Sequence, residues 1–293
     1  MKQPRTADLA VVIVNYDTGG WLTRCLASLD RHRGDIEVDV VIIDNASHDG
    51  SHERALEDHP WARLVENERN VYLSPAWNQG AALTDAPFVL FLNPDTEWWR
   101  GTLADLVAVA AANPQVAIVG PMVRSVVGLP YASGRVFPSI VDAVGHAFMS
   151  PITRDNPFTR RYEMDGWDRS TERVVDWVSG CCMLMRRDAF DAVGGFDEGF
   201  ALYAEELDIA TRLRDAGWAV LFTPVVEVLH AVGISTKGAR RPHRLAVMHS
   251  DSHYRYYRKH RASGWRRFTL PLAWTALRLR AEIDWLAGRI ERP

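Results

Sequence analysis

Two acidic residues stand directly after apolar segments in the N-terminal half of the chain. Residues 88–92 are five consecutive apolar residues, and the turn sequence Asn93-Pro94-Asp95 follows them at once. Because Pro94 has no N–H group to donate, we expect a buried strand to stop there and leave Asp95 just past its carboxyl end. Asp44 follows a second apolar segment in the same way. Open α/β sheets bind ligands at the carboxyl ends of their strands, and a carboxylate there suits a divalent metal that holds a diphosphate.

Two more groups of titratable residues belong to the same candidate site. Glu205-Glu206-Leu207-Asp208 opens an expected helix, and His230 ends the last expected strand. Asp95 and His230 are able to ligate Mn²⁺ or Mg²⁺, and Asp44 can accept the ring N–H of a pyrimidine base. The acidic helix start can deprotonate an acceptor hydroxyl. Taken singly, each residue also has an ordinary explanation as a cap, a turn residue or a hydrogen-bonded histidine.

The helical repeat distinguishes the two adjacent glutamates. One residue turns a helix by ~100°, so positions three to four apart share a face. Glu206 lies in the middle of an apolar stripe formed by Leu202, Ile209, Ala210 and Leu213, whereas Glu205 shares another face with Asp208 and Arg212. Because a carboxylate on the buried side loses hydration, its pKa rises and it becomes the better proton acceptor. Glu206 is therefore the predicted general base, with Glu205 as the alternative.

The segments that must position these residues alternate between strand and helix up to residue 120. Strands are predicted at Leu9–Val14, Val38–Ile43, Arg63–Val65, Phe88–Leu92 and Val116–Val119. Helices are predicted at Trp21–Leu29, after the capping residues 47–51, at Pro75–Leu83, and at Leu103–Ala112 behind Thr102. This alternation indicates an α/β fold with βαβ units and a mostly parallel sheet. No GxGxxG sequence follows the first strand, which argues against a dinucleotide-binding domain.

The second half of the chain is less regular. Scattered Gly and Pro predict a long irregular segment over residues 121–173. Order is expected again at 177–185 and 188–193, in a helix near 204–216, and in strands at 218–222 and 225–230.

The last part of the chain is basic and rich in aromatic residues. Residues 237–267 hold ten Lys or Arg against one acid, Asp251, and residues 270–290 form an amphipathic pattern that carries Trp274 and Trp285. This composition fits either a solvated helical face or a helix that binds an anionic membrane surface. A nucleic-acid partner is not expected, because no binding motif of that class is present.

Composition is that of an ordinary globular protein, with 47% hydrophobic residues and a net charge of −3. The three cysteines have no CxxC spacing, which suits a reducing cytoplasm better than a disulfide framework or a zinc site. No signal-peptide-like apolar region opens the sequence, and no apolar run approaches the ~20 residues of a membrane span.

Ordered motifs along residues 9–235 make the chain resemble the inverting family-2 glycosyltransferases with a GT-A fold. The matching segments are 11–16, 41–51, Asn70, 78–80, 92–95, 177–180, 194–198, 205–208 and 230–235. Segment 92–95 stands where the family's DxD metal motif belongs, with Asn93 in place of the first acid. Within the family, segments 133–139, 155–159 and 263–267 are similar to actinobacterial rhamnosyltransferases that act on polyprenyl-diphosphate-linked N-acetylglucosamine in building the arabinogalactan linker of the cell wall.

This resemblance implies metal-dependent transfer of L-rhamnose from dTDP-L-rhamnose to that lipid-linked acceptor. It implies that Asp95 and His230 bind Mn²⁺ or Mg²⁺ and that Glu206 or Glu205 is the catalytic base. The residues that it assigns to the nucleotide and donor are Asn15, Tyr16, Asp44, Asn45, Ser47, Asn70, Asn78, Asn93 and Arg135. Those that it assigns to the acceptor are Trp177, Gly180 and Asp208. The chain departs from the family pattern at residues 71–73, beside the donor, and at Glu206, where the family has an aspartate.

The resemblance also implies a division of the chain. Residues 1–120 would form the nucleotide-sugar-binding half of a GT-A domain, residues 121–236 its acceptor and catalytic half, and residues 237–293 a helical tail. We expect a cytoplasmic protein whose tail docks on the inner face of the plasma membrane. The tail residues expected at the headgroup level are Trp265, Trp274, Trp285, Arg266, Arg267, Arg278 and Arg280. Packing of the tail on the catalytic domain, or at a homodimer interface, is the alternative.

Three other functions compete with rhamnosyl transfer. The same enzyme class can use another donor, such as a UDP-hexose. A catalytically silent nucleotide-sugar-binding or scaffold protein can keep the fold, although the presence of both Glu206 and Asp95 argues against this. A nucleotidyltransferase is disfavoured, because no basic Gly-rich loop for a triphosphate lies near the first strand.

Overall fold

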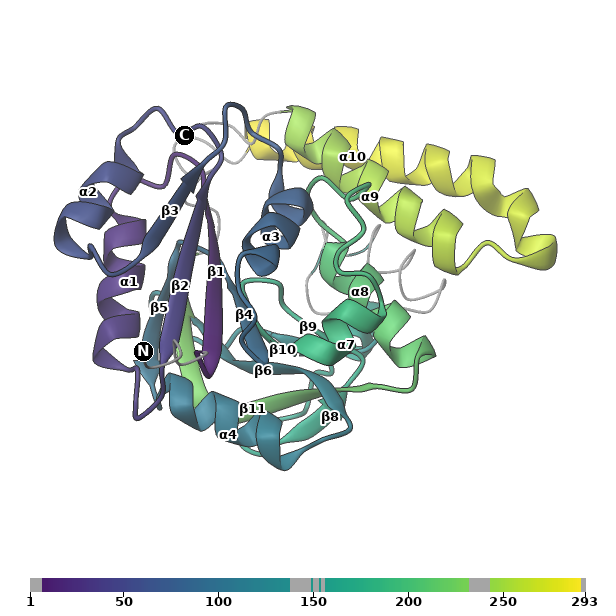
Figure 1. Cartoon of the computed structure of the whole chain (residues 1–293). Helices are drawn as coiled ribbons and strands as arrows, with labels where there is room; N and C mark the ends of the chain where they lie inside the picture. The colour runs from purple at the N-terminus through teal and green to yellow at the C-terminus, as the bar shows by residue number, and fades with distance from the viewer. Residues whose placement is uncertain (1–6, 138–148, 150–152, 154–155, 232–242, 291–293) are drawn as a thin grey trace.

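A nine-stranded sheet runs through the part of the chain described by the computed structural model, residues 7–137, 149, 153, 156–231 and 243–290 (Figure 1). The strand order is β3-β2-β1-β4-β10-β6-β11-β5, and β8 pairs with β11. The strands are β1 (Leu9–Asn15), β2 (Val38–Asp44), β3 (Arg63–Glu66), β4 (Phe88–Leu92), β5 (Thr96–Arg100), β6 (Val116–Ser125), β8 (Arg173–Val175), β10 (Cys182–Arg186) and β11 (Ala219–His230). A separate ribbon pairs β7 (Gly134–Arg135) with β9 (Trp177–Val178).

The N-terminal half is a parallel sheet wound by βαβ units, as the sequence predicts. β3, β2, β1 and β4 run parallel, and the connections contain α1 (Trp21–Arg31), α2 (Ser51–Asp58) and α3 (Leu73–Ala82). Every residue of β1 is buried, and alternate residues enter two cores on opposite faces of the sheet. A Cβ on Gly80 of α3 would lie 2.3 Å from Val12 Cγ1, so glycine is what lets this helix pack so closely on β1.

The C-terminal half of the sheet is mixed. β10 runs antiparallel between β4 and β6, and β11 runs parallel to β6. The two strands predicted at 218–222 and 225–230 are one strand, β11, whose register shifts between Thr223 and Glu227. Pro224 lies within this shift and cannot donate to the ladder, so it produces a bulge and not an end.

Two further predictions differ from the structure. β5 is not predicted, because only one of its faces is buried and the strand begins within one turn of Pro94. The predicted irregular segment 121–173 is partly ordered: β6 continues to Ser125, and α6 (Pro157–Tyr162) follows later. Residues 138–148, 150–152 and 154–155 of that segment, with Ser139 and Asp155 of the quoted motifs, lie outside the described residues.

Helices α4 (Leu103–Ala112), α7 (Arg187–Ala192) and α8 (Glu205–Asp215) complete the layers around the sheet. Thr102 caps α4 as predicted, since its hydroxyl accepts from Asp105 N and the Asp105 carboxylate accepts from Thr102 N. α4 packs in the core that contains α1, whereas α7 and α8 pack in the core that contains α3.

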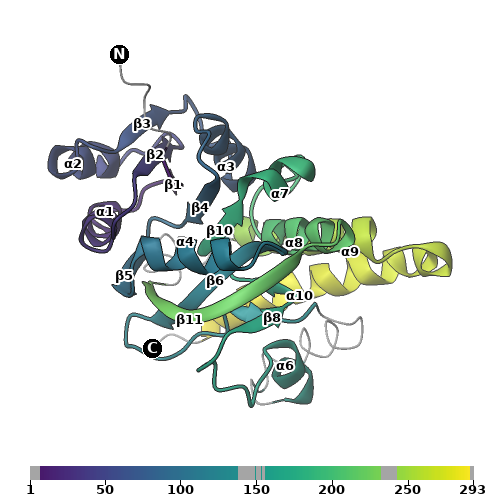
Figure 2. The ribbon, with the colours of Figure 1, turned by 60° about the horizontal axis from the view of Figure 1, so that its bottom comes forward.

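The end of the chain forms a helical hairpin of α9 (His243–His260), the 3₁₀ helix η2 (Gly264–Thr269) and α10 (Leu270–Ile290). Ser250 Oγ donates to Leu277 O, and Asp251 pairs with Arg278, so the two long helices are joined side by side. Figures 1 and 2 show the hairpin beside α8, with its η2 end projecting away from the sheet. None of the described helices has the length and apolar character needed to cross a membrane. The expected tail boundary near Lys237, residues 232–235 of the 230–235 motif, and Arg292 lie outside the described residues.

Candidate active site

Asp95 and His230 lie together because β5 folds back onto β11. β5 starts directly after Asp95, and its antiparallel pairing sets Thr96 opposite His230. Ala231 N donates to Asp95 O at 2.9 Å, and Asp95 Oδ1 lies 3.2 Å from His230 Nε2. Burial alone would lower the pKa of His230, but Cys181 and the Asp95 carboxylate raise it to about 11. The Asp95 carboxylate beside Nε2 thus favours the protonated form of the His230 ring.

The geometry of this pair fits part of a metal coordination shell. Ligands about 2.1 Å from an octahedral Mg²⁺ lie about 3 Å apart when they are neighbours, close to the Asp95–His230 separation. No cluster of three or more His, Cys, Asp or Glu suited to a metal occurs within the described residues. A cation held here would therefore take its other ligands from substrate oxygens and water.

Glu205 and Glu206 open α8 behind a strained turn. Tyr203 and Ala204 have φ angles of 71° and 63°, in the left-handed region that costs a non-glycine residue ~1–3 kcal/mol. Such strain is concentrated at active sites, where the surrounding structure enforces it. The turn fixes the direction in which the two carboxylates leave the helix.

Both glutamates are shielded from water, but Glu205 is the more buried of the two, whereas the helical repeat predicts that Glu206 is. Glu205 is 5% exposed, whereas Glu206 is half-buried. α9 packs against the side of α8 that carries Asp208, while Arg214 and Asp215 near the end of the helix are exposed. Burial raises the pKa of both carboxyl groups, and the charge of Glu206 raises that of Glu205 further. One carboxylate oxygen of each, Oε2, is buried and has no hydrogen-bond partner among the described residues.

Three residues predicted from the family motifs lie around Glu206. A Cβ on Gly180 would be 3.8 Å from Glu206 Cβ and Cδ, so this glycine packs directly on the glutamate. The Arg135 guanidinium is 5.0 Å from the Trp177 ring centroid and close enough to Glu206 to oppose the rise in the pKa of that carboxyl group. Tyr131 and Tyr162 complete an aromatic cage around the guanidinium, and both accept hydrogen bonds from it. A cation, an aromatic wall and a buried carboxylate therefore meet at one place.

Asn15, Asp44 and Ser47 form a buried network at the carboxyl ends of β1 and β2. Asn15 Nδ2 donates to Asp44 Oδ1 at 2.7 Å, and Ser47 donates to Asp44 through both its hydroxyl and its backbone N–H. These bonds hold the loop after β2 and leave Asp44 only partial capacity to accept from a base. Tyr16 beside them is 42% exposed.

The remaining asparagines of the predicted donor site differ in their surroundings. Asn45 donates to Tyr72 O, and Asn70 accepts from Tyr72 N, so both shape the loop before α3. Asn78 both donates to and accepts from the backbone of Phe196 at 2.9 Å, which commits its amide to that turn. Asn93 is half-buried beside Asp95, and its backbone N–H donates to Cys181 O.

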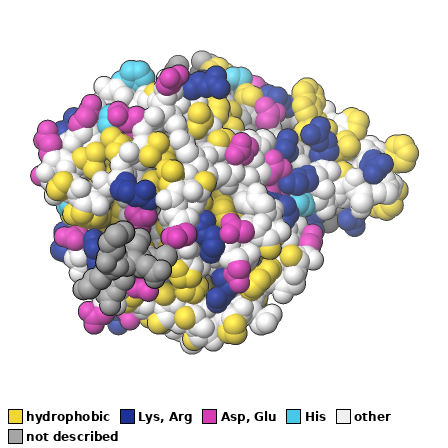
Figure 3. Space-filling view, viewed as in Figure 1, with side chains coloured by type: hydrophobic (Ala, Val, Ile, Leu, Met, Phe, Trp, Pro, Cys, Tyr) yellow, Lys and Arg dark blue, Asp and Glu magenta, His cyan; other side chains and the backbone are white. Residues whose placement is uncertain are grey.

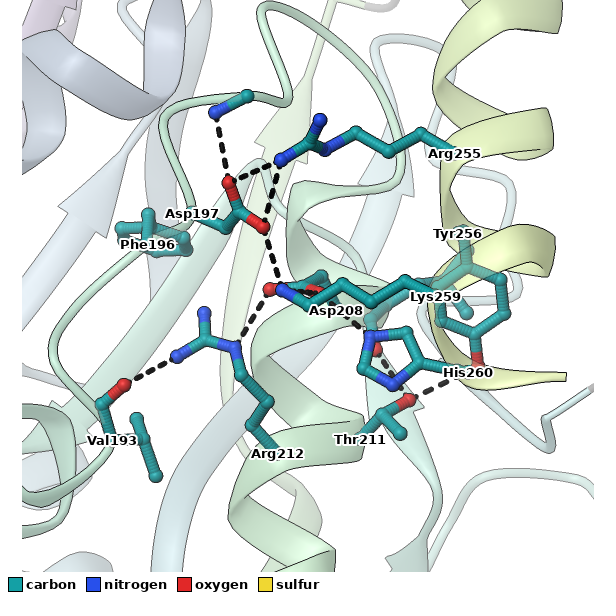
Figure 4. A network of polar contacts seen from close by, with 12 residues as sticks. Val193, Phe196, Asp197, Asp208, Thr211, Arg212, Arg255, Tyr256, Lys259 and His260 are labelled. Atoms are coloured by element: carbon teal, nitrogen blue, oxygen red, sulfur yellow. Dashed lines mark hydrogen bonds and ion pairs between the residues drawn. The ribbon is translucent and has the colours of Figure 1, made fainter. Parts of the chain in front are cut away.

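Asp208, predicted to contact the acceptor, is instead enclosed in an ion cluster (Figure 4). Its side chain is fully buried and accepts from Arg212 Nε, Lys259 Nζ and His260 Nε2, each at 2.7 Å. Burial would raise the pKa of Asp208, but His260, Lys259 and Arg212 lower it to about 2. Its oxygens are thus occupied by the protein, and direct acceptor binding does not fit this geometry.

The sequence pattern did not predict that α9 belongs to the site. Lys259 and His260 stand in the basic segment for which the sequence favours a solvated or membrane-facing tail, with packing on the catalytic domain as the alternative; for α9, the packing alternative holds. One sequence signal could have indicated this contact. Asp208 and Arg212 are spaced i,i+4 and can pair within one helix, and the Asp208 carboxylate can still accept from a further cation.

Comparison with known proteins places the chain among glycosyltransferases. The profile of glycosyl transferase family 2 matches residues 10–194. The N-acetylglucosaminyl-diphospho-decaprenol L-rhamnosyltransferase of Mycobacterium tuberculosis is 37% identical over 278 residues, which cover 91% of this chain and 88% of that protein. The rhamnosyltransferase WbbL of Escherichia coli is 29% identical over 50% of this chain and 53% of its own length.

Solved structures share the fold at low sequence identity. The mannosyltransferase PcManGT from Pyrobaculum calidifontis, in complex with GDP-Man and Mn²⁺, is 19% identical with a TM-score of 0.59, covering 100% of this chain and 80% of that one. GalNAc-T7 with UDP, GalNAc and Mn²⁺ is 16% identical with a TM-score of 0.57, covering 89% of this chain and 57% of that one.

Proposed function

Because the chain belongs to glycosyl transferase family 2, and is therefore a glycosyltransferase, we propose that it transfers L-rhamnose from dTDP-L-rhamnose to a polyprenyl-diphosphate-linked N-acetylglucosamine, with inversion at the anomeric carbon. The observation that carries this proposal is the 37% identity to a rhamnosyltransferase with that acceptor in its name, sustained over 91% of the chain. The product would serve cell-wall linker synthesis. A UDP-hexose donor is the alternative within the same enzyme class.

The proposed chemistry is a single displacement. The acceptor hydroxyl oxygen forms a bond to the anomeric carbon as the bond from that carbon to the diphosphate breaks, and the bonding electrons leave with dTDP. Glu206 takes the hydroxyl proton, and Glu205 is the alternative base. The buried Glu206 carboxyl group has a raised pKa, and the adjacent Arg135 favours its ionised form, so it suits a base at neutral pH.

Asp95 and His230 would hold a divalent metal against the donor diphosphate. Their ligand atoms converge within 3.2 Å at the carboxyl edge of the sheet, with Asn93 alongside. Mn²⁺ or Mg²⁺ bound there supplies positive charge that stabilises the departing diphosphate. An imidazole ligates a metal only in its neutral form, so metal binding at His230 would compete with protonation of the ring.

The lipid-linked acceptor implies contact with a membrane surface, and we assign this contact to the η2 end of the C-terminal hairpin. Trp265, Phe268 and Leu272 are 71%, 88% and 71% exposed, and Arg266 and Arg267 are exposed among them. Figure 3 shows hydrophobic side chains at the end of the projecting hairpin with Lys and Arg alongside. Aromatic and basic side chains together are the composition that binds the headgroup region of anionic bilayers.

Two of the tail residues expected at the headgroup level have partners within the hairpin. Trp285 packs edge-on against the His243 ring, 5.0 Å between centroids, and so lies within the hairpin and not at its tip. Arg278 pairs with Asp251. Phe268 and Leu272, which the sequence reading did not single out, are the most exposed apolar side chains of the tip together with Trp265.

An assay with purified enzyme tests the proposed function. It combines dTDP-L-rhamnose, UDP-glucose or UDP-galactose with a synthetic N-acetylglucosaminyl-diphosphoryl lipid and Mn²⁺, and the products are identified by mass spectrometry. We expect a rhamnosylated lipid and free dTDP, and no hexose transfer. Preferred transfer from a UDP-hexose would move the assignment to the alternative donor. Binding of the nucleotide sugars without transfer of sugar from any of them would indicate a catalytically silent binding protein.

A further inference from the structure

We propose that α9 is a positioning element of the active site, which holds the Glu205–Glu206 turn in its working geometry through Ser252 and the ion cluster at Asp208. The inference rests on the proposed role of this pair in proton transfer. α9 belongs to the segment that sequence alone assigns to the tail, yet it contacts the chain before, at and after the two glutamates. Figure 4 shows α9 side chains directed into the cluster at Asp208.

The contacts before the glutamates are made by Arg255 and Lys259. Arg255 donates to Asp197 at 2.9 Å, and Lys259 donates to the same carboxylate at 2.6 Å. A Cβ on Gly199 would lie 2.0 Å from a guanidinium nitrogen of Arg255, so this arginine lies flat on backbone that only glycine leaves open. Lys259 reaches Asp208 as well, and it therefore joins the chain on both sides of the pair.

The contact at the turn is made by Ser252. Its hydroxyl donates to Leu202 O at 2.7 Å, directly before the left-handed residues Tyr203 and Ala204. The Tyr203 ring packs edge-on against His249 of the same helix, 4.9 Å between centroids. Left-handed backbone at two consecutive non-glycine residues persists only where neighbouring groups enforce it. Ser252 and His249 are the α9 groups placed to do so.

The contacts after the glutamates lie one helical turn further on. Asp208 N donates to Ala204 O at 3.0 Å, and the Asp208 carboxylate accepts from His260 and Lys259. Thr211 Oγ1 lies 3.0 Å from the Tyr256 hydroxyl of α9. The first turn of α8 is thus fixed to α9 by buried polar contacts, while Glu206 faces Gly180.

This arrangement separates the position of the base from the binding of the donor. A general base acts only within about 2.6–3.2 Å of the proton that it removes, so a small shift of α8 weakens catalysis. Asp44, Asp95 and His230, proposed to bind the base and the metal, stand at or just past the ends of β2, β4 and β11, whereas Ser252 bonds to Leu202 O before α8. Loss of the Ser252 contact should therefore lower kcat and leave nucleotide affinity unchanged.

A pair of serine variants on one helix tests the proposal in the full-length enzyme. Ser252→Ala removes the bond to Leu202 O, and Ser250→Ala removes an equally long, 2.7 Å bond from a buried serine to Leu277 O in α10. We expect similar losses of melting temperature in both variants. Only Ser252→Ala should lower kcat, by about tenfold, with dTDP affinity within twofold of the wild type. Equal kcat losses in both variants, or none in Ser252→Ala, would overturn the proposal.

Hydrogen exchange tests whether α9 holds the turn before α8, independently of turnover. Amides of residues 200–208 should exchange faster in Ser252→Ala than in the wild type and in Ser250→Ala. Unchanged exchange there means that α9 does not hold the turn, whatever the activity. A wild-type enzyme that protects this turn but transfers no sugar would instead count against the proposed function alone.

Discussion

Glu205 and Glu206 are adjacent and alike in chemistry, but Glu205 is buried and Glu206 half-buried, and different charges lie beside them. Burial raises the pKa of each carboxyl group. Arg135 lies beside Glu206 and favours its charged form, whereas Glu205 has the charge of Glu206 as its neighbour. Arg135 thus favours the charged form of Glu206, and the charge of Glu206 disfavours that of Glu205.

Glu206→Gln should bind dTDP normally and turn over at least ~10²-fold more slowly, because the amide cannot accept the hydroxyl proton. The wild-type kcat/KM should fall as pH drops through the raised pKa of this carboxyl group, above its ordinary value of 4.5. Steady-state kinetics between pH 5 and pH 8 measure both effects. Near-normal turnover in Glu206→Gln, together with a large loss in Glu205→Gln, would transfer the role of base to Glu205.

Asp95→Ala should remove the effect of Mn²⁺ on nucleotide binding, because Asp95 is the carboxylate assigned to the proposed metal position. In the wild type, dTDP with Mn²⁺ should raise the melting temperature more than dTDP with EDTA, since a ligand of the native state stabilises it. In Asp95→Ala the two shifts should be equal. Asp30→Ala, an exposed carboxylate on α1, is the control and should keep the wild-type difference. A preserved Mn²⁺ effect in Asp95→Ala would exclude this residue as a ligand.

At the level of elements, the junction of α8 and α9 concentrates charge in a buried place. Asp208 has no exposed surface, and its carboxylate is contacted by Arg212, Lys259 and His260. Removing one partner of such a cluster leaves the others buried without compensation, so its members are costly to change. The junction therefore makes α9 part of the folded catalytic unit, and the last described helices are not a detachable appendage.

The lowered pKa of Asp208 makes this junction sensitive to acid. Its value of about 2 in the folded state is below the ordinary 3.8, so the carboxylate stabilises the fold fully above pH ~4 and loses this effect as pH falls through about 2. Asp208→Asn should lower the free energy of unfolding by about 2 kcal/mol at pH 5–7 and by progressively less below pH 4. Urea unfolding at several pH values measures the difference.

Asp251→Asn provides the matched control for this measurement. Asp251 also pairs with an arginine, Arg278, but it is exposed, and exposed pairs contribute only ~0–1 kcal/mol. Its substitution should change stability little at any pH. If the free energy of unfolding falls by the same amount in Asp208→Asn at every pH, the residue contributes through its shape and not through its charge.

At the scale of the whole molecule, the hairpin joins the catalytic unit to a projecting apolar tip. Arg244 near the start of α9 donates to the Tyr72 hydroxyl, and the Tyr72 carbonyl accepts from Asn45 at the edge of the loops proposed to bind nucleotide. The far end carries Trp265, Phe268 and Arg266 in the open. A tip docked on a bilayer would hold the carboxyl edge of the sheet at a constant orientation to that surface.

Vesicle flotation tests whether the tip binds a bilayer. The wild type should float with vesicles that contain phosphatidylglycerol and not with neutral phosphatidylcholine vesicles, because each arginine near an anionic surface contributes about 1 kcal/mol. Trp265→Ser with Phe268→Ser should abolish flotation and leave dTDP binding intact. Trp99→Ser, at a 61% exposed tryptophan on β5, is the control and should float. Flotation that ignores both lipid charge and the tip substitutions would leave packing as the role of the hairpin.

The sequence by itself determined the features that depend on local pattern. Apolar runs that end at Asp44 and at Asn93-Pro94-Asp95 predicted two strands with an acid at the end of each. Such predictions succeed because strand burial and turn formation depend on a few neighbouring residues. The helix that begins at Glu205, the cap at Thr102 and the family membership were also predictable, since each depends on short ordered motifs.

Only the tertiary structure decided which side of α8 is buried and what Asp208 contacts. The helical repeat separates an apolar face from a polar one, but it cannot show that a later helix will cover the polar face. α9 does so with Lys259 and His260, which enclose the Asp208 carboxylate. Contacts between residues so distant in the chain leave no periodic signal, because they are fixed by packing and by the pairing of buried charges.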